Sequence, residues 1–124
     1  MRKKVLIVDS NYPNENNLYG DVFVHSRARF YKNVFDIQVL GWDKRRENFE
    51  FTYEGIQAKS FKTKKELTRN IFEYKPDIIL IHFVEGWMLS AFIEPINCPV
   101  LIWVHGAEAL GWYRRIFKIG RAHV

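Results

Sequence analysis

The sequence predicts a protein of the α/β class, with a parallel β-sheet that carries helices on both faces. Two observations lead to this prediction. Short continuous apolar runs, such as VLIV at residues 5–8 and IILI at residues 78–81, are typical of strands buried on both sides of a parallel sheet. Segments with helical spacing of their apolar residues lie between these runs, as in βαβ units. The 124 residues are enough for one domain or for part of one.

The first half of the chain predicts two strands, a helix and a hairpin. Asp21 can cap the helix, because an aspartate at this position accepts hydrogen bonds from free backbone N–H groups. The alternation in FEFTYEGIQAKSF, with Glu-Gly in its middle, favours a small hairpin or a bent strand. The expected elements are a strand at 3–10, a loop at 11–21, a helix at 21–33, a strand at 34–42 and the hairpin at 49–61.

The second half predicts two more strands, each reached through a helix. An amphipathic helix should turn Leu67, Ile71 and Phe72 inward and end before Pro76. Right-handed crossovers leave few topologies, so we expect a Rossmann-like order in which the last two strands are neighbours. The expected elements are a helix at 62–75, a strand at 77–83, a short helix at 85–96 closed by Pro95, a strand at 99–106 and the beginning of a helix at 108–118.

Composition excludes several classes of protein. Hydrophobic residues make up 48% of the chain, so a packed core is expected rather than disorder. Cys98 is the single cysteine, which excludes an internal disulfide. No apolar run has the length of a signal peptide or of a membrane span, so we expect a cytoplasmic protein.

The net charge of +5 comes from basic clusters at residues 43–49, 61–70 and 111–118. Such clusters can simply be solvated faces of loops and helices. Alternatively, they can attract an anionic substrate or the inner face of a membrane. Nucleic acid is not expected as a partner, because no known binding module is present. The last six residues, 119–124, continue no periodic pattern. We expect them to be a non-native tail, with residues 1–118 forming the domain.

Polar residues follow several of the predicted strands. Asp9, Ser10 and Asn11 follow the first strand, and a His-x-x-Glu pair follows each of the last two, namely His82 with Glu85 and His105 with Glu108. In an open parallel sheet, ligands bind beyond the carboxyl ends of the strands, near the point where the strand order reverses. A loop that contains Gly20 leads from the first strand into the first helix, whose N-terminus suits an anion. We therefore expect these groups to converge in one cleft.

Each of these residues also has a structural interpretation. His105 can be a strand-end histidine bonded to the backbone, Glu108 can complement a helix dipole, and Gly20 can be a simple turn residue. His25, on the face of the first helix, can belong to the packing. The two His-x-x-Glu pairs could bind zinc, but their spacing matches no known metal motif, and we expect no metal.

Four stretches of the chain resemble the amino-terminal domain of family 4 glycosyltransferases, which have the GT-B architecture of two facing Rossmann-like domains. The stretches are VLIVDSNYPN…YGDVFVHSRARFYK, FDIQVLGW, KPDIILIHFVEGW and PVLIWVHGAEALGWYRRIF. The resemblance implies retaining transfer of a sugar from a nucleotide-sugar donor to a sugar or lipid-linked acceptor, without a metal or other cofactor. The amino-terminal domain of this family shapes the acceptor side.

The resemblance also implies roles for individual residues. His105 matches a histidine that reaches toward the donor sugar and is the candidate catalytic residue. The loop of Tyr19 and Gly20 should lie near the donor phosphates or the acceptor. The other candidate donor- or acceptor-binding residues are Asn11, His25, His82, Glu85, Gly106 and Glu108. Many family members have two glycines in the first loop, where this chain has Tyr19 before Gly20. The nucleotide pocket lies in a carboxyl-terminal domain that these residues do not include, so we expect the 124-residue chain alone to be inactive.

Three other classes of function remain open. The first and third strands resemble those of a response-regulator receiver domain, but His82 stands where a receiver has its phosphate-accepting aspartate. A nicotinamide-dependent enzyme needs the G-x-G-x-x-G fingerprint directly after the first strand, and this loop has one glycine. A non-catalytic module that binds a nucleotide or a sugar could use the same cleft.

Overall fold

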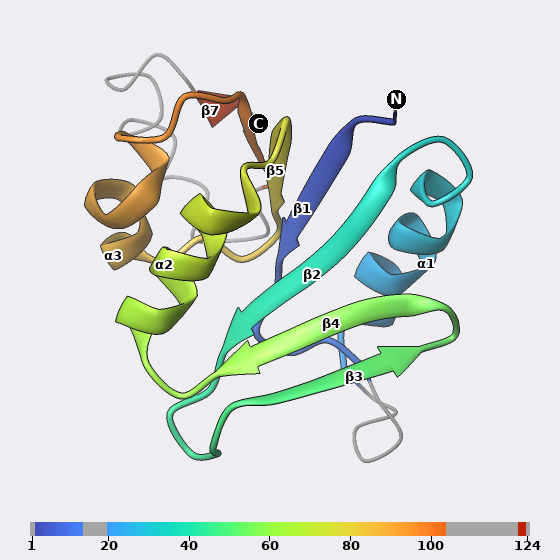
Figure 1. Cartoon of the computed structure of the whole chain (residues 1–124), viewed down its shortest axis with the longest axis horizontal. Coiled ribbons are helices and arrows are strands. Elements are labelled where there is room, and N and C mark those ends of the chain that lie inside the picture. Colours follow the sequence, from blue (N-terminus) through green and yellow to red (C-terminus); the bar gives the residue numbers. More distant parts are fainter. Residues whose placement is uncertain (1, 14–19, 104–121, 124) are drawn as a thin grey trace.

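The structure is a computed structural model that describes residues 2–13, 20–103 and 122–123 (Figure 1). A sheet forms its centre, and helices lie on both sides of the sheet. The elements are β1 Lys4–Val8, α1 Val22–Tyr31, β2 Asp36–Trp42, β3 Phe49–Tyr53, β4 Ile56–Phe61, α2 Lys64–Tyr74, β5 Ile78–Ile81, α3 Gly86–Met88, the π-helix η1 Leu89–Ile93, β6 Val100–Ile102 and β7 Ala122–His123.

The strand order is β3-β4-β2-β1-β5-β6-β7. The neighbours pair in parallel, except that β3 and β4 are antiparallel. Without the hairpin strand β3, and without β7, which belongs to the predicted tail at 119–124, the parallel strands follow the 3-2-1-4-5 part of the Rossmann-like arrangement. The predicted α/β class is therefore confirmed, but the sheet is mixed rather than purely parallel, because β3 pairs with β4 in the antiparallel direction. The predicted pairing of the two late strands is confirmed as well, with Ile79 of β5 opposite Val100 of β6.

Alternate residues of the strands point to opposite faces and build two cores. On one face, Val5 and Ile7 of β1 lie in a buried cluster with Val24 and Ala28 of α1. On the other face, Leu6 and Val8 belong to the cluster that contains buried residues of α2, α3 and η1. Figure 1 shows α1 and α2 with β1 and β2 between them. The two-sided burial explains why β1 reads as a continuous apolar run.

The segment between β2 and α2 is a hairpin, which decides between the hairpin and the bent strand that the sequence allows. Tyr53 and Ile56 face each other at its end. Glu54 and Gly55 between them have φ values of 47° and 84°. Two successive residues with positive φ are characteristic of the type I′ turn, which matches the twist of the flanking strands.

Helix α2 begins and ends at residues of the expected kinds. Thr63 caps it by accepting a hydrogen bond from the backbone N–H of Glu66 at 3.1 Å. Leu67 and Ile71 are fully buried, as predicted. The prediction for Phe72 is wrong, because its side chain is 39% exposed. Leu67 and Ile71 are four residues apart and define the buried stripe, and the next residue is turned by about 100° away from it.

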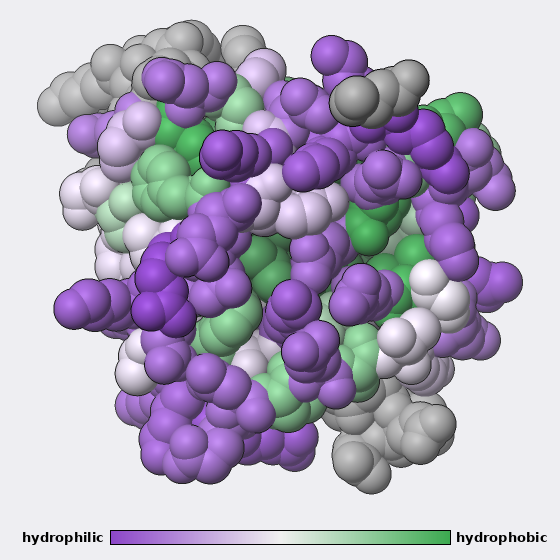
Figure 2. Space-filling view, viewed as in Figure 1, coloured by the Kyte–Doolittle hydropathy of each residue, from purple (hydrophilic) through white to green (hydrophobic). Residues whose placement is uncertain are grey.

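Two other details differ from the sequence-based expectations. Asp21 occupies the N-cap position of α1, but its side chain makes no capping hydrogen bond. The predicted short helix between β5 and β6 exists, but its second part, η1, has π-helical bonding. None of the helices in the described ranges is long and apolar enough to cross a bilayer. In the view of Figure 2, hydrophilic residues cover most of the surface, with smaller hydrophobic areas between them.

Candidate functional site

The candidate site is built on the segment that follows β1. At this point the strand order reverses, because β2 lies on one side of β1 and β5 on the other. The segment is fastened to the end of β2 by two hydrogen bonds. The backbone N–H of Asp9 donates to the carbonyl of Leu40 at 3.0 Å, and the backbone N–H of Trp42 donates to Oγ of Ser10 at 3.0 Å. These bonds fix Asp9 and Ser10 at the carboxyl edge of the sheet.

Gly41 of β2 makes this fastening possible. A Cβ atom at residue 41 would lie 2.5 Å from the carbonyl oxygen of Asp9 and 3.0 Å from Cα of Ser10. Such distances are too short for any side chain, and the neighbouring atoms belong to the backbone. Gly41 was not among the site residues predicted from the sequence, although a glycine inside a strand is a recognised sign of close backbone approach.

Asn11 joins the end of β1 to the beginning of α1. Its backbone N–H donates to Oδ1 of Asp9 at 3.2 Å, and its side-chain amide donates to Oδ1 of Asp21 at 3.3 Å. Its carbonyl accepts a hydrogen bond from the backbone N–H of Asp21 at 2.8 Å. The strand end and the segment that begins with Gly20 are therefore held together. The Asp21 carboxylate bonds Asn11 instead of capping α1, which explains the absence of the expected cap.

The carboxyl group of Asp9 is held in its protonated form. Asp9 is buried, with only 5% of its surface exposed. Burial, together with a hydrogen bond to the Asp21 carboxyl and the charge of that group, raises the pKa of Asp9 to about 8, although the N–H of Asn11 opposes the shift. The raised pKa favours the protonated form of the Asp9 carboxyl near neutral pH.

A hollow of about 230 Å³ opens between the ends of β1 and β5, and we call it the switch-point hollow. It combines three carboxyl groups, an amide and a hydroxyl with the phenyl ring of Phe83, which is 41% exposed. No lysine, arginine or histidine is among its described lining residues. Those residues are Val8, Asp9, Ser10, Asn11, Asp21, Phe83, Glu85 and Met88. The carboxylate of Glu85 is oriented by the indole N–H of Trp87, which donates to it at 3.1 Å.

A second hollow, of about 290 Å³, lies on the other side of the Asp9–Asn11 segment, and we call it the hairpin hollow. Its rim is basic, since Arg45, Arg46 and Lys59 line it. Arg45 pairs with Asp43 at 3.0 Å, and the hydrogen bond from this arginine is the main reason that the pKa of Asp43 is lowered. Arg46 lies 5.6 Å from the ring centre of Phe49.

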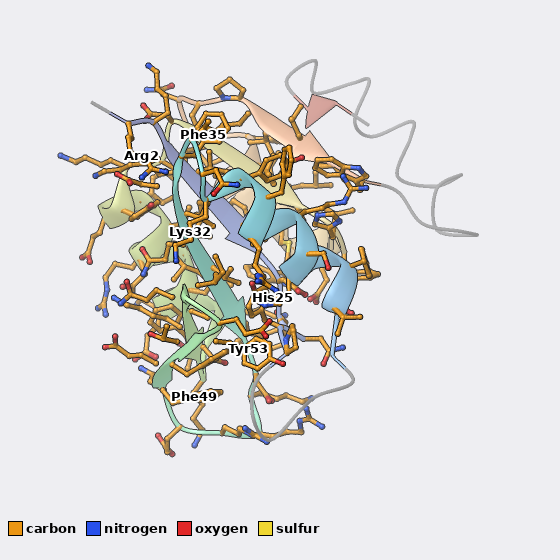
Figure 3. The ribbon with its side chains drawn as sticks, turned by 90° about the vertical axis from the view of Figure 1, so that its right-hand side faces the viewer. Arg2, His25, Lys32, Phe35, Phe49 and Tyr53 are labelled. Carbon is orange, nitrogen blue, oxygen red and sulfur yellow. The ribbon has the colours of Figure 1, made fainter. Side chains whose placement is uncertain are left out.

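His25, a predicted binding residue, lies in a buried hydrogen-bonded chain. Its Nδ1 is 2.5 Å from the hydroxyl of Tyr12, and its Nε2 is 2.7 Å from Oε1 of Glu54. Burial is the main cause that raises the pKa of Tyr12, so this hydroxyl keeps its proton. Figure 3 shows His25 beside Tyr53, with ring centres 4.8 Å apart. His25 therefore ties α1 to the β3–β4 turn in this structure.

His82, which directly follows β5, is 1% exposed. Its ring stacks on that of Trp103, with centres 4.7 Å apart and planes 12° from parallel. The ring of Phe23 meets it edge-on at 5.5 Å. His82 lies at the carboxyl end of β5, as predicted, but it lines neither hollow. The next residue, Phe83, does line the switch-point hollow, and the sequence analysis did not select it.

The structure thus brings together part of the predicted set. Asn11 and Glu85 line one hollow, and Gly20 directly precedes Asp21 of the same hollow. His25 and His82 are packed inside the protein. The remaining predicted residues, Tyr19, His105, Gly106 and Glu108, lie outside the described residues.

The described part of the chain contains no group of three or more histidine, cysteine, aspartate or glutamate side chains placed to hold a metal ion. Comparison of the whole chain with protein-family models, with curated proteins and with solved structures gave no match.

Proposed function

We propose that this chain is the acceptor-side, amino-terminal domain of a retaining glycosyltransferase with two Rossmann-like halves. The four stretches that resemble family 4 glycosyltransferases support the proposal, and so does the strand order. The observation that carries it is the switch-point hollow, since it lies where ligands bind in open parallel sheets and its lining suits a sugar.

The lining of this hollow matches the chemistry of a carbohydrate. Each sugar hydroxyl both donates and accepts hydrogen bonds. The carboxyl oxygens of Glu85 can accept them, the Asp9 carboxyl can donate one because its raised pKa favours the protonated form, and the amide of Asn11 can do both. The exposed ring of Phe83 offers an apolar surface to the C–H face of a pyranose. A pocket with a few convergent polar groups and an aromatic wall is typical of small-molecule sites.

The same lining supports an acceptor role rather than a phosphate-binding role. A diphosphate needs cations or free backbone N–H groups, and the described lining offers carboxyl groups instead. In this proposal the nucleotide of the donor binds to a second domain outside these 124 residues. The resemblance implies that His105 reaches toward the donor sugar and that the nucleoside diphosphate leaves without help from a metal ion.

Ligand-observed NMR with a panel of neutral monosaccharides and disaccharides tests the binding part of the proposal. We expect saturation transfer to at least one sugar, and a loss of about three- to tenfold in affinity for Glu85→Gln and for Phe83→Ala, because each change removes one contact. The matched control is Phe72→Ala, which removes an equally exposed phenyl ring from α2. An equal loss of affinity in Phe72→Ala would contradict the proposed site. Unchanged affinity in both Glu85→Gln and Phe83→Ala would contradict it as well.

A transfer assay with nucleotide-sugars tests the catalytic part. We expect no sugar transfer by the 124-residue chain alone, because the proposed donor pocket is not part of it. Turnover of any nucleotide-sugar by the isolated chain would contradict the division of labour proposed here, even if sugar binding in the hollow were confirmed.

A further inference from the structure

Helix α1 carries exposed apolar side chains outside the face that it packs against the sheet. Among the described residues, four of the six most exposed large hydrophobic side chains lie in α1 or in the turn after it. They are Val22 at 53%, Phe23 at 40%, Phe30 at 71% and Val34 at 60%. The opposite face of α1 is buried through Val24, His25 and Ala28. The helix therefore has two apolar faces, of which the fold uses one.

Basic residues flank the exposed apolar face. At about 100° per residue, Phe23 and Phe30 lie close together in projection, while Arg27 lies to one side of them and Arg29 to the other. The segment 22–35 contains Arg27, Arg29 and Lys32 and no aspartate or glutamate. Apolar side chains along the middle and cations along both borders are characteristic of helices that lie in the plane of a membrane interface.

The face continues to the proposed binding site. Phe23 meets the ring of Phe83 edge-on, with centres 5.9 Å apart. Phe83 in turn lines the switch-point hollow. Exposed aromatic rings therefore run from the outer face of α1 to the mouth of that hollow. A partner surface that contacts the outer face of α1 would therefore lie next to the opening of the switch-point hollow.

We propose that the outer face of α1 docks on a membrane that contains anionic lipids, with Phe23, Phe30 and Val34 entering the interface and the flanking cations facing the lipid headgroups. Charge complementarity selects this partner over an uncharged surface, because the segment carries three exposed cations and, within the described residues, only Arg29 of the three pairs with a carboxylate, that of Glu54 at 3.5 Å. The inference does not depend on glycosyl transfer, since it uses only the exposure and charge of α1.

Vesicle co-sedimentation of the 124-residue chain tests the proposal. The probes are phosphatidylcholine vesicles with and without phosphatidylglycerol, at low and at high salt. We expect binding to the anionic vesicles only, and weaker binding at high salt, because salt screens the attraction. The double variant Phe30→Ser/Val34→Ser should bind about tenfold more weakly, since it removes two apolar groups from the interface.

The control for the apolar contribution is Phe72→Ser, which removes an exposed phenyl ring from α2 on the other face of the sheet. Circular dichroism and the unfolding midpoint of each variant verify that it folds. Absence of binding to anionic vesicles would overturn the proposal, and so would equal binding by the double variant. A dimer in analytical ultracentrifugation that the double variant abolishes, without vesicle binding, would assign the face to a second copy of the chain instead.

Discussion

The two hollows beside Asp9 share a wall and differ in charge. The Asp9–Asn11 segment lines both of them. The switch-point hollow receives its other polar groups, Asp21 and Glu85, from the beginnings of α1 and α3. The hairpin hollow receives Arg45, Arg46 and Lys59 from the β2–β3 loop and from β4. One strand end therefore supports two chemistries, and the neighbouring elements decide which of them each side has.

The wall itself is the most sensitive part of this arrangement. We expect Gly41→Val to destabilise the protein by about 3 kcal/mol, because the new side chain would meet the backbone of Asp9 and Ser10. Urea unfolding measures the effect. The control is Gly55→Asn, since asparagine tolerates the positive φ of that turn residue and its Cβ would meet only the end of the flexible Lys32 side chain, not backbone. Equal stability of Gly41→Val and the wild type would mean that the wall does not depend on this close approach.

The stability contributions of Asp9 and of Asp43, on the two sides of this wall, should change with pH in opposite directions. The pKa of Asp9 is raised from 3.8 to about 8 in the folded protein, so folding binds a proton between these values and stability falls as the pH rises from about 4 to 8. Asp9→Asn replaces the protonated acid by an amide of the same shape. It should therefore stabilise the protein by about 1–3 kcal/mol at pH 8 and change little at pH 4.

Asp43 on the other side provides the matched comparison. Its pKa is lowered in the folded state, so its contribution is present above the unfolded pKa and is lost as the pH falls through the folded pKa. Asp43→Asn should therefore have its destabilising effect near neutral pH and lose it in acid. Thermal unfolding across pH 3–9 measures both variants. Parallel pH profiles for the two would contradict the difference in environment.

Inorganic phosphate gives the smallest expected effect and probes charge alone. We expect it to shift the amide signals of Lys59 and Ser60 in NMR spectra and to leave those of Asp21 and Glu85 unchanged. Arg46→Gln should weaken this binding by about three- to fivefold, because an exposed cation contributes below about 1 kcal/mol. Lys65→Gln, on the exposed face of α2, is the control for total charge. Phosphate-induced shifts at Asp21 as large as those at Lys59 would contradict the difference in charge between the two hollows.

The fold was predictable because it follows from local patterns. Apolar runs gave the parallel strands, and Glu54-Gly55 indicated the turn between β3 and β4. Phe72 was misplaced because an apolar residue next to Ile71 looks like part of the same stripe when only composition is considered.

The site was predictable only in part, because its contacts join residues that are distant in sequence. Polar residues after β1 pointed to the correct edge. However, the partners of His25 are Tyr12 and Glu54, and the latter lies 29 residues away on the hairpin. The raised pKa of Asp9 likewise depends first on burial and then on Asp21, which is close to Asp9 only in the folded protein. Nothing in the local sequence of either residue reveals such a partner.

The chain of contacts through Tyr12, His25 and Glu54 also has a thermodynamic consequence. Tyr12 directly follows Asn11, and His25 belongs to α1. Glu54 belongs to the turn that connects β3 and β4. Whatever immobilises α1 from outside therefore also restrains the peptide that separates the two hollows. Linkage makes such an effect reciprocal, so occupancy of either hollow and adsorption through α1 should strengthen or weaken each other by the same factor.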